Sequence, residues 1–510
     1  MIASTAQVDP ASPILIVGLG ETGVAAARWC ARQGRPLRIA DTRVNPAGLD
    51  ALRESIGDHA ADYHLGCDTF ASSLLDGVRQ LVLSPGLSPL LSPVKELLDE
   101  AAAAGIEVVG ETELFARALI QLAESREYRP QVVGITGTNG KTTVTALTRH
   151  LLEAAGIRAR VAGNISPCGL HALMDALDAD NLPAAWVLEL SSFQLETTTS
   201  LRLDAAAVLN VTQDHLDWHG SMQAYAAAKA RILGMAQVCV VNRDDPVVMG
   251  MVPSIAVANV RSFGRDTPML CADLGIESSH EVNWLVSAEP LDFEDDAPAP
   301  TRRKKNALPP ERKPGRLSRL MPVDALAIRG MHNALNCQAA LLLARALGAG
   351  WGPLLRAACD YVGEPHRMAF VRSVRGVDFF NDSKGTNVGA TVAGLEGLGR
   401  KSVLIAGGVG KGQDFSPLAP VVARHARAVV LIGQDGPIIE EVLAGTGVDC
   451  ITAISMDQAV ALAFARALDG DAILLSPACA SFDMFRNYPH RGSVFVDAVN
   501  ALALEQGEVA

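Results

Sequence analysis

A glycine-rich run that ends in a lysine and two threonines is the strongest chemical signal in the sequence. Its members are Gly134, Gly137, Gly140, Lys141, Thr142 and Thr143, between the apolar stretch 131–135 and the helical stretch 144–156. Glycines at such a turn let backbone N–H groups point at phosphate oxygens, and the helix N-terminus adds its positive end. Lys141 would reach the β and γ phosphates of a nucleoside triphosphate, and Thr142 could hold Mg²⁺. Ile135 breaks the strict GxxxxGK(S/T) pattern, so a glycine-rich turn without a ligand is the alternative.

A second group of polar residues follows strands farther along the chain. Glu189 ends the apolar stretch 185–189, and Asp214, His215 and Asp217 come soon after the next one. Carboxylates and an imidazole at the carboxyl ends of strands beside a phosphate loop are where Mg²⁺ ligands would lie. Each residue alone could instead cap a helix or hold a loop. Together with the phosphate loop, the group predicts a metal site.

Near the N-terminus, Gly18, Gly20 and Gly23 follow the apolar stretch 14–17, and Asp41 closes the next strand. This spacing fits the fingerprint of a dinucleotide-binding turn. It supports a rival hypothesis, a nicotinamide-dependent dehydrogenase. Such an enzyme would need two unrelated nucleotides, because the chain already holds a nucleoside-triphosphate loop. Detectable NAD binding would separate the two hypotheses.

Short β-branched strands that alternate with Ala- and Leu-rich helices must position these residues. We expect strands within residues 14–18, 37–41, 80–86, 107–110, 131–137, 185–192, 205–212, 377–383, 401–408, 428–433 and 471–478. The alternation is typical of parallel sheets in α/β layers. A chain of 510 residues is too long for one hydrophobic core, and we expect three α/β domains at about 1–112, 113–363 and 364–510.

Residues 290–322 break the globular pattern. The stretch combines acidic and basic runs with frequent prolines and little apolar periodicity. We expect a disordered surface insertion within the second domain. A basic docking arm is the alternative.

The composition excludes several classes of protein. With 49% hydrophobic and 20% charged residues, the chain is expected to be compact rather than disordered. A net charge of −12 argues against a nucleic-acid partner, which would favour a basic surface. No apolar run is long enough for a membrane span, and the N-terminus lacks the charged region of a signal peptide. Nine scattered cysteines without a CxxC pair predict reduced thiols in the cytoplasm.

Seven motifs together carry a resemblance to a known family. They are TGTNGKTT at 136–143, ELSSFQLE at 189–196, NVTQDHLDWHG at 210–220, GMHNALN at 330–336, PHR at 365–367, NDSKGTN at 381–387 and SPACASFDMFRNYPHRG at 476–492. In these motifs the chain resembles the Mur ligase family over nearly its whole length. The resemblance implies an N-terminal Rossmann-like domain for a uridine nucleotide, a central P-loop ATPase domain and a C-terminal Rossmann-like domain for the incoming amino acid.

Within the family, the chain is most similar to the members that add D-glutamate to UDP-N-acetylmuramoyl-L-alanine. The basis is GLGETG at 18–23, SPG at 84–86, Asn139 in the phosphate loop, the closing SPACASFDMF and the lack of a DNPR signature. The resemblance implies ATP and two Mg²⁺ ions as cofactors and a cytoplasmic monomer that makes precursors of peptidoglycan. Folylpolyglutamate synthase is the alternative, although it lacks a uridine-binding domain at the front.

The family's site residues carry over to matching positions. The resemblance implies uridine-nucleotide contacts at Gly18, Gly20, Thr22, Asp41, Thr42, Arg43, Ser84, Gly86 and Asn164. It implies ATP contacts at Gly137, Thr138, Asn139, Gly140, Lys141, Thr142, Thr143, Asn333, Asn336, Arg367 and Asp382. It implies amino-acid contacts at Lys384, Thr386, Lys411, Ser481 and Tyr488, where the family often has phenylalanine at the last position.

The resemblance also implies how these residues act. Thr142 and Glu189 would hold one Mg²⁺, and His215 and Lys229 the second, with Lys229 carbamylated because an ammonium would repel the ion. From sequence alone, Lys229 would be an ordinary lysine on a surface helix. The catalytic residues implied are Lys141, His215, Lys229 and Arg367. The reaction implied is phosphoryl transfer from ATP to a carboxylate, followed by attack of an amine on the acyl phosphate.

Overall fold

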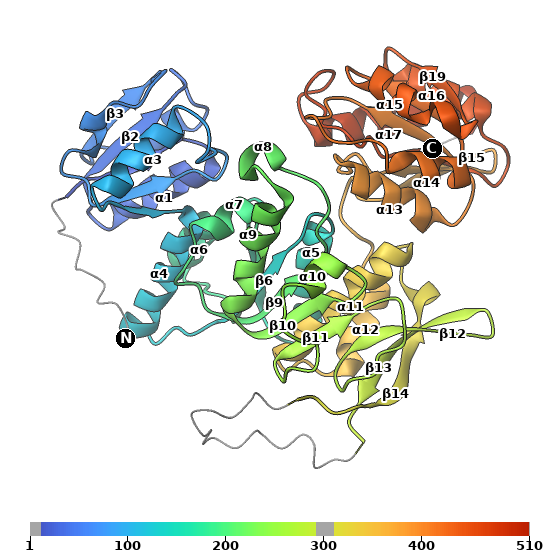
Figure 1. Cartoon of the computed structure of the whole chain (residues 1–510), viewed down its shortest axis with the longest axis horizontal. Helices are drawn as coiled ribbons and strands as arrows, with labels where there is room; N and C mark the ends of the chain where they lie inside the picture. The colour runs from blue at the N-terminus through green and yellow to red at the C-terminus, as the bar shows by residue number, and fades with distance from the viewer. Residues whose placement is uncertain (1–11, 292–310, 509–510) are drawn as a thin grey trace.

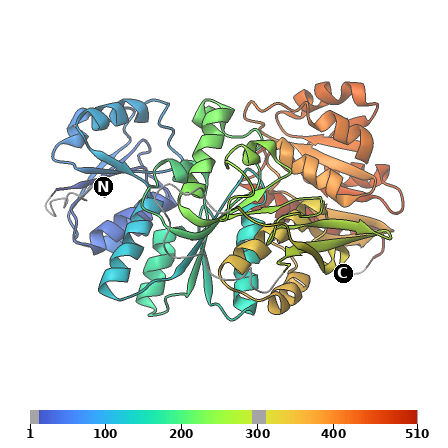
Figure 2. The ribbon, with the colours of Figure 1, turned by 60° about the horizontal axis from the view of Figure 1, so that its bottom comes forward.

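The computed structural model describes residues 12–291 and 311–508, which form three α/β units in a row (Figure 1). In this view the N-terminal unit lies at the upper left, the C-terminal unit at the upper right and the central unit between and below them. A second view shows the central sheet with helices on either side of it (Figure 2). The expected class, three domains with parallel sheets in α/β layers, is confirmed.

The N-terminal unit is a five-stranded parallel sheet in the order β3-β2-β1-β4-β5. Its elements are β1 (Ile14–Val17), α1 (Glu21–Arg32), β2 (Leu37–Asp41), α2 (Leu49–Ile56), β3 (Ala61–Leu65), β4 (Gln80–Leu83), α3 (Val94–Ala103) and β5 (Glu107–Val109). The direction of strand succession reverses at β1, between β2 and β4. In open α/β sheets, ligands bind beyond the carboxyl ends of the strands at such a reversal.

The central unit has a six-stranded parallel sheet in the order β11-β10-β9-β6-β8-β7. Its strands are β6 (Gln131–Thr136), β7 (Ala159–Gly163), β8 (Ala185–Glu189), β9 (Leu203–Val208), β10 (Ala236–Asn242) and β11 (Val260–Phe263). Its helices are α4 (Glu111–Ser125), α5 (Lys141–Ala154), α6 (Gly169–Asp178), α7 (Ser192–Glu196), α8 (Leu216–His219), α9 (Met222–Gly234), α10 (Pro246–Met249), α11 (Met331–Ala346) and α12 (Trp351–Asp360). Because β8, β6 and β9 are neighbours, the segments that follow them meet at one edge of the sheet.

A small antiparallel sheet of β12 (Leu274–Ser279), β13 (Val282–Glu289) and β14 (Arg316–Pro322) adjoins the central unit. The expectation of disorder over 290–322 was wrong for its final part, because 316–322 pairs with β13. The sequence hides β14, since only one of its seven residues is buried and prolines stand at 314, just before it, and at its last position, 322. Residues 292–310 of the expected insertion lie outside the described residues.

The C-terminal unit is a six-stranded sheet in the order β15-β16-β20-β17-β18-β19, parallel except for the edge strand β15. Its strands are β15 (Ala369–Val374), β16 (Val377–Asn381), β17 (Ser402–Gly407), β18 (Ala426–Ile432), β19 (Asp449–Thr452) and β20 (Ala472–Leu475). Its helices are α13 (Val388–Leu398), α14 (Leu418–His425), α15 (Gly436–Leu443), α16 (Met456–Arg466) and α17 (Tyr488–Glu505).

The hydrophobic cores show how firmly the units are joined. One apolar cluster runs from the N-terminal sheet through α4 and α6 into the central unit, with Phe115 edge-on to Trp186 at 5.4 Å between ring centroids. The C-terminal unit has two clusters of its own, built from residues between 368 and 503. An interface without a shared apolar core favours relative motion of domains. The contacts between the C-terminal and central units are therefore the ones that would control motion of one unit relative to the other.

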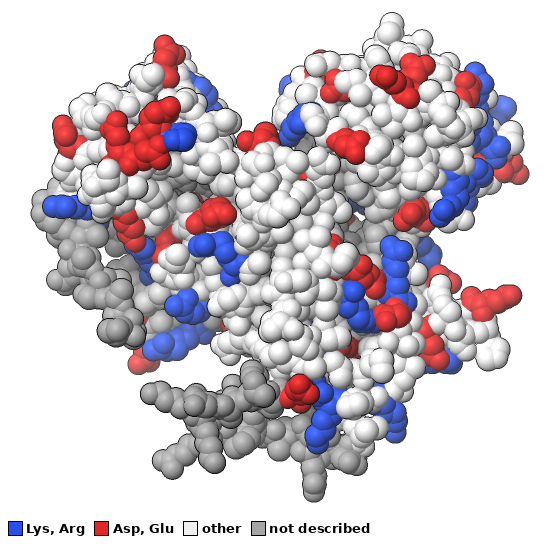
Figure 3. Space-filling model, viewed as in Figure 1, with Lys and Arg blue, Asp and Glu red and all other residues white. Residues whose placement is uncertain are grey.

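The surface carries charges of both signs. On the face shown in Figure 3, acidic and basic side chains are interspersed rather than gathered into one broad patch. Within the described ranges, no helix combines the length and the apolar character that crossing a membrane would take.

Candidate active site

The phosphate loop joins the end of β6 to the start of α5. Gly140 has φ +83, and a Cβ there would lie 2.6 Å from the Asn336 Oδ1, so glycine is required both for the backbone and for the space. Lys141 folds back on the loop, and its Nζ donates to the carbonyls of Gly137 and Thr138 at 2.8 Å each. Burial lowers the pKa of Lys141. An anion entering the loop would offer this ammonium a better partner than two carbonyls.

The loop is joined to the ends of β8 and β7 by a row of hydrogen bonds. The Thr142 hydroxyl donates to Glu189 Oε2 at 2.8 Å, and Asn164 Nδ2 donates to Glu189 Oε1 at 2.8 Å. Arg367, which follows the central unit in sequence, donates to the same Thr142 hydroxyl. A hydroxyl and a carboxylate side by side are hard oxygen donors of the kind that Mg²⁺ prefers. These two residues fit a Mg²⁺ ion beside the phosphates.

His215 is the N-cap residue of α8 and has a left-handed backbone conformation. Its φ is +53, a conformation that costs energy for a residue with a side chain. Asp214 Oδ2 is 3.6 Å from its Nε2, and the ring of Phe193 meets the imidazole edge-on at 4.7 Å between centroids. Burial lowers the pKa of His215, so the ring is neutral at pH 7 and able to offer a lone pair to a cation.

Lys229 is 1% exposed, so its interpretation as a surface lysine was wrong. The packing of α9 against the sheet turns its side chain inward, where Nζ donates to the Gly137 carbonyl at 2.9 Å. The ammonium also lies 4.5 Å from the centroid of the Tyr225 ring. Burial, together with the nearby Lys141 charge, lowers the pKa of Lys229 well below its usual range. A neutral amine is the form that reacts with CO₂.

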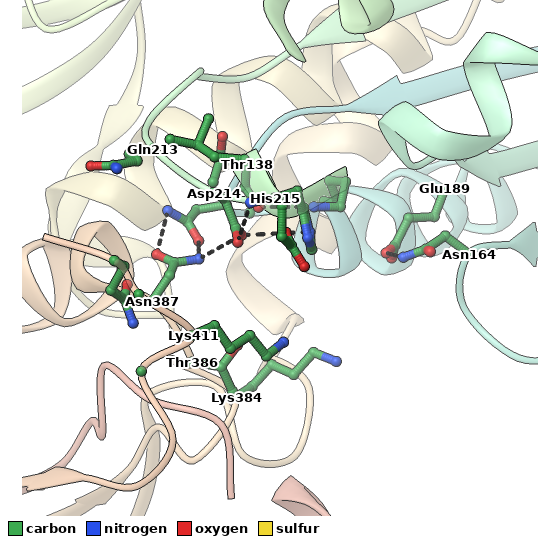
Figure 4. Close-up of a pocket in the computed structure, with 18 of the residues that line it drawn as sticks. Thr138, Asn164, Glu189, Gln213, Asp214, His215, Lys384, Thr386, Asn387 and Lys411 are labelled. Carbon is green, nitrogen blue, oxygen red and sulfur yellow. Dashed lines mark hydrogen bonds and ion pairs between the residues drawn. The ribbon is translucent and has the colours of Figure 1, made fainter. Parts of the chain in front are cut away.

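A polar cavity of about 220 Å³ between the central and C-terminal units is lined by Lys141, Glu189, His215 and Arg367, among others. Thr142 and Lys229 do not line this cavity; they are hydrogen-bonded to Glu189 and to the Gly137 carbonyl. Figure 4 shows Asp214 and His215 on its central-unit wall, Glu189 and Asn164 at one end, and Lys384, Thr386 and Lys411 facing them from the C-terminal unit. Burial and the Arg367 charge lower the pKa of Lys384 to about 8. The cavity thus brings the phosphate-loop lysine, the Glu189 carboxylate, the His215 imidazole and the cationic groups of the C-terminal unit together.

A second cavity of about 320 Å³ adjoins the first on the far side of the phosphate loop. The predicted nucleotide residues Asn333, Asn336, Arg367 and Asp382 line it, and so do Asn139, Gly140 and Thr143. Burial raises the pKa of Asp382 to about 7, and the Ser476 hydroxyl donates to its carboxylate at 2.8 Å. The cavity has the size and the mixed polarity that a nucleoside needs.

The residues predicted for the uridine nucleotide form a separate group at the carboxyl ends of β1, β2 and β4 in the N-terminal sheet. Gly18, Gly20 and Thr22 follow β1, Asp41, Thr42 and Arg43 stand at the end of β2, and Ser84 and Gly86 follow β4. The Ser84 hydroxyl donates to the Gly18 carbonyl at 2.8 Å, so the loops after β1 and β4 touch. Asp41 accepts the Leu19 N–H at 2.7 Å. Asn164, the remaining predicted member, lies in the polar cavity instead.

Two predicted amino-acid contacts do not line either cavity. Ser481 is 3% exposed, in the loop after β20. Tyr488 begins α17, and its ring lies 3.9 Å from the Lys384 Nζ, measured to the ring centroid. The structure therefore places Tyr488 behind Lys384, where it can orient the ammonium.

Sequence reasoning assigned no role to Arg491 or Asn387, although both stand in quoted motifs. Arg491 is 1% exposed and donates to the Ser383 carbonyl at 2.8 Å and the Cys479 carbonyl at 3.1 Å. It thereby ties together the two loops that carry the predicted amino-acid residues. Its signal was an arginine on the apolar face of a helix, four residues before Phe495. Asn387 gave no such signal, because its partner Asn139 is remote in sequence.

Known proteins match this chain over most of its length. Three family models match successive parts of the chain: the Mur ligase MurD-like N-terminal domain over 12–110, the Mur ligase middle domain over 135–294 and the Mur ligase glutamate ligase domain over 366–479. Proteins named UDP-N-acetylmuramoylalanine--D-glutamate ligase are 67% identical in Bordetella bronchiseptica and 55% identical in Ralstonia nicotianae, covering 98% of this chain in both cases and 98% and 99% of those proteins.

Solved structures share the fold at low identity. The UDP-N-acetylmuramate-alanine ligase of Thermotoga maritima has a TM-score of 0.54 at 16% identity and covers 96% of this chain and 100% of its own. A folylpolyglutamate synthase of Mycobacterium tuberculosis has a TM-score of 0.52 at 18% identity and covers 80% of this chain and 97% of its own. On the family models and the full-length relatives, the chain belongs to the Mur ligase family of ATP-dependent, amide-bond-forming enzymes.

Proposed function

We propose that this protein joins D-glutamate to UDP-N-acetylmuramoyl-L-alanine at the expense of ATP, through an acyl phosphate, in the synthesis of peptidoglycan precursors. The observation that carries the proposal is the polar cavity between the central and C-terminal units. It unites the phosphate-loop Lys141, the Thr142–Glu189 pair and the Lys384–Lys411 group. The names of the full-length relatives support the choice of substrates.

In this proposal ATP occupies both cavities. The adenosine would lie among Asn333, Asn336 and Asp382, and the phosphates would cross the loop of residues 137–143. Thr138 and Asn139 line the polar cavity on the phosphate side. Arg367 lines both cavities, so its guanidinium can follow charge as it moves from ATP to the acceptor carboxylate.

We propose that two Mg²⁺ ions bind, one at Thr142 and Glu189 and the other at His215 and a carbamate on Lys229. Oxygen donors and a neutral imidazole support these assignments, and so does the burial of Lys229 beside the phosphate loop. When bound, Mg²⁺ would screen the repulsion between the anionic γ-phosphate and the anionic carboxylate.

The chain's own residues would then carry the reaction in two stages. Lys141 and Arg367 hold the γ-phosphoryl group while a carboxylate oxygen of the acceptor attacks phosphorus and ADP leaves. The amine of D-glutamate then attacks the acyl carbon, the C–O bond to phosphate breaks, and phosphate departs as the amide forms. Closure of the two units around the cavity excludes water, which would otherwise hydrolyse the acyl phosphate.

We propose that the carboxyl edge of the N-terminal sheet, with Asp41, Arg43 and Ser84, holds the uridine nucleotide, and that Asn164 reaches its diphosphate. Lys384, Thr386 and Lys411 would hold the carboxylates of D-glutamate, with Ser481 and Tyr488 supporting them. The domains would divide at about 1–112, 113–363 and 364–510. A cytoplasmic location follows from the use of ATP and a uridine nucleotide, and a monomer is expected.

The test is phosphate release with UDP-N-acetylmuramoyl-L-alanine, ATP and a panel of amino acids. Release that depends on D-glutamate, with little activity from L-glutamate, L-lysine or meso-diaminopimelate, is expected. A preference for L-lysine or meso-diaminopimelate would overturn the choice of amino acid. Release with a folate and L-glutamate in place of the uridine precursor would overturn the assignment to peptidoglycan synthesis.

A further inference from the structure

Helix α13 (Val388–Leu398) is the part of the C-terminal unit that rests on the central unit. In Figure 1 it lies at the edge of the C-terminal unit that faces the central one. Its first turn approaches the phosphate loop, since a Cβ on Gly389 would lie 3.0 Å from Thr212 Oγ1 and 3.2 Å from Asn139 Nδ2. Near its last turn, a Cβ on Gly397 would lie 2.6 Å from His332 Nδ1. The helix therefore lies along the second cavity, and both of its ends contact the central unit.

A reciprocal pair of amide hydrogen bonds joins the first end of α13 to the phosphate loop. Asn387 Nδ2 donates to Asn139 Oδ1 at 3.0 Å, and Asn139 Nδ2 donates to Asn387 Oδ1 at 3.2 Å. Asn387 is 8% exposed and its Nδ2 also lies 3.5 Å from Asp214 Oδ2. Paired amides fix both distance and orientation, because each residue is donor and acceptor at once.

Each partner of the pair is rigidly held by its own unit. Asn387 is the N-cap of α13, and its Oδ1 accepts the Ala390 N–H at 2.9 Å. The backbone N–H of Asn139 donates to Asn210 Oδ1 at 2.8 Å. A shift of the phosphate loop would therefore move α13, and with α13 the neighbouring residues Lys384 and Thr386.

We propose that Asn387 is a positioning residue that couples the phosphate loop to the seating of the C-terminal unit through its amide pair with Asn139. This inference rests on the proposed function for what the coupling serves, which is to bring Lys384 and Thr386 to the reacting atoms once ATP occupies the loop. The C-terminal unit has apolar clusters of its own. A specific polar contact can therefore decide how this unit lies against the central unit.

The test compares wild type with Asn387→Ser, Asn139→Ser and the double variant. Serine keeps an N-cap for α13 but cannot reach across the joint. We expect each single variant to lower kcat by at least about fivefold, as for a typical coupling between sites. The KM for the uridine precursor, which the N-terminal unit would bind, should hardly change. The double variant should stay within about twofold of the slower single variant, because the two residues form one interaction.

A second measurement does not depend on the reaction. Small-angle scattering with Mg²⁺ and a non-hydrolysable ATP analogue should give a larger radius of gyration for Asn387→Ser than for wild type. Gly389→Ala should have the same effect by steric wedging, although alanine favours a helix. Gly445→Ala, where an added Cβ meets nothing within 4 Å, is the matched control and should behave as wild type.

Asn487→Ser is the stability control, because it makes the same substitution at another N-cap of the same unit. Asn487 Oδ1 accepts the His490 N–H at 2.9 Å. Asn387→Ser should lower the Tm by no more than this control does. Effects of the two single variants that multiply in the double variant, or an unchanged kcat and radius of gyration, would overturn the proposal. If wild type showed no phosphate release with D-glutamate, the proposed function would fail, while the scattering comparison would still decide the coupling.

Discussion

The Thr142 hydroxyl and the Glu189 carboxylate are 2.8 Å apart, from Oγ1 to Oε2, although 47 residues separate them in sequence. They meet because Thr142 starts the helix after β6 and Glu189 ends β8, and β6 and β8 are neighbours in one parallel sheet. Asn164, after the next strand, donates to the same carboxylate. Adjacent parallel strands thus deliver the glycine-rich loop and the carboxylate proposed to bind Mg²⁺ to one place.

Lys141→Ala should lower turnover by several orders of magnitude, because in the proposed function its ammonium would contact the transferring phosphoryl group. Binding of the uridine precursor should be nearly intact, since its proposed site lies in another unit. Steady-state phosphate release and calorimetric titration of the precursor measure the two effects. Full activity in this variant would end the phosphate-loop assignment.

Lys229→Ala should abolish activity and be partly rescued by short carboxylates such as acetate or formate, because an anionic oxygen would replace the carbamate. Lys229→Gln serves as a control, since its larger side chain fills the space and blocks rescue. Labelling with ¹³C-bicarbonate should show a carbamate signal in wild type that the variants lack. Wild-type rates in Lys229→Ala would rule the carbamate out as a metal ligand.

Lys411→Ala should raise the KM for D-glutamate far more than those for ATP or the uridine precursor, because its charge acts on one substrate. Lys411 lines the polar cavity from a turn in which it has φ +54. D-Glutamine and D-alanine should be poor acceptors for the wild type, since the ammonium would be left unpaired. The matched control is Lys401→Ala, because Lys401 donates to carbonyls at an exposed edge of the same sheet. Equal changes in all three KM values would contradict the assignment.

Arg312→Ala should destabilise the fold even though Arg312 stands within the segment that was expected to be disordered. Its guanidinium is 5% exposed and lies 2.5 Å from Asp273, which is 3% exposed. Removing one partner of a buried ion pair leaves the other uncompensated and costs about 3–5 kcal/mol. Arg319→Ala, in β14, breaks a more exposed pair with Glu277 of β12 and should leave the urea midpoint almost unchanged. Equal midpoints for the two variants would show that the Arg312 contact carries little energy.

That contact also limits which residues can be deleted. A deletion from 292 to 317 would remove Arg312 and the first two residues of β14. The variant lacking 292–317 should be less stable than a variant lacking 292–310. The difference in urea midpoint should follow the decrease measured for Arg312→Ala. Catalysis per folded molecule should stay within a few-fold in both, because the small sheet does not line either cavity.

Glu111→Gln should stabilise the protein above neutral pH. Burial raises the pKa of Glu111 to about 7, and Glu21 nearby adds to the effect. In the unfolded state this carboxyl has an ordinary pKa of about 4.3, so between that pH and about 7 only the folded state holds the proton. Stability therefore falls as pH rises through this range. Glutamine stays neutral and can still accept the Leu170 N–H that Glu111 Oε1 accepts. Urea midpoints at pH 5.5 and pH 8 should show the advantage of glutamine growing with pH.

Glu113, two residues along α4, gives a control of opposite sign. Burial raises its pKa, but hydrogen bonds from Ser200 and Thr199 and from Arg117 outweigh burial and lower it overall. Its ionised form therefore stabilises the fold, and this stability is lost as pH falls through the lowered pKa. Glu113→Gln should be less stable than wild type at pH 8. A parallel response of Glu111→Gln and Glu113→Gln would contradict the difference in their environments.

The sequence by itself determined the local chemistry of this protein. The phosphate loop could be read from its residues, because glycines, Lys141 and Thr142 act within one turn between a strand and a helix. Every expected strand segment overlaps an observed strand, since buried parallel strands leave continuous apolar runs. β14 was missed for the opposite reason: only one of its seven residues is buried, and pairing with β13 makes them a strand.

Tertiary structure decided the contacts between distant segments. Whether Lys229 faces solvent or the phosphate loop depends on which side of α9 packs against the sheet, and the sequence of α9 has no clear apolar stripe to settle it. The pairing of Asn387 with Asn139 requires two separately folded units to meet at one orientation, which no local pattern encodes. Propensity and periodicity describe what a segment does within a few residues, whereas burial and domain contacts depend on the whole packed chain.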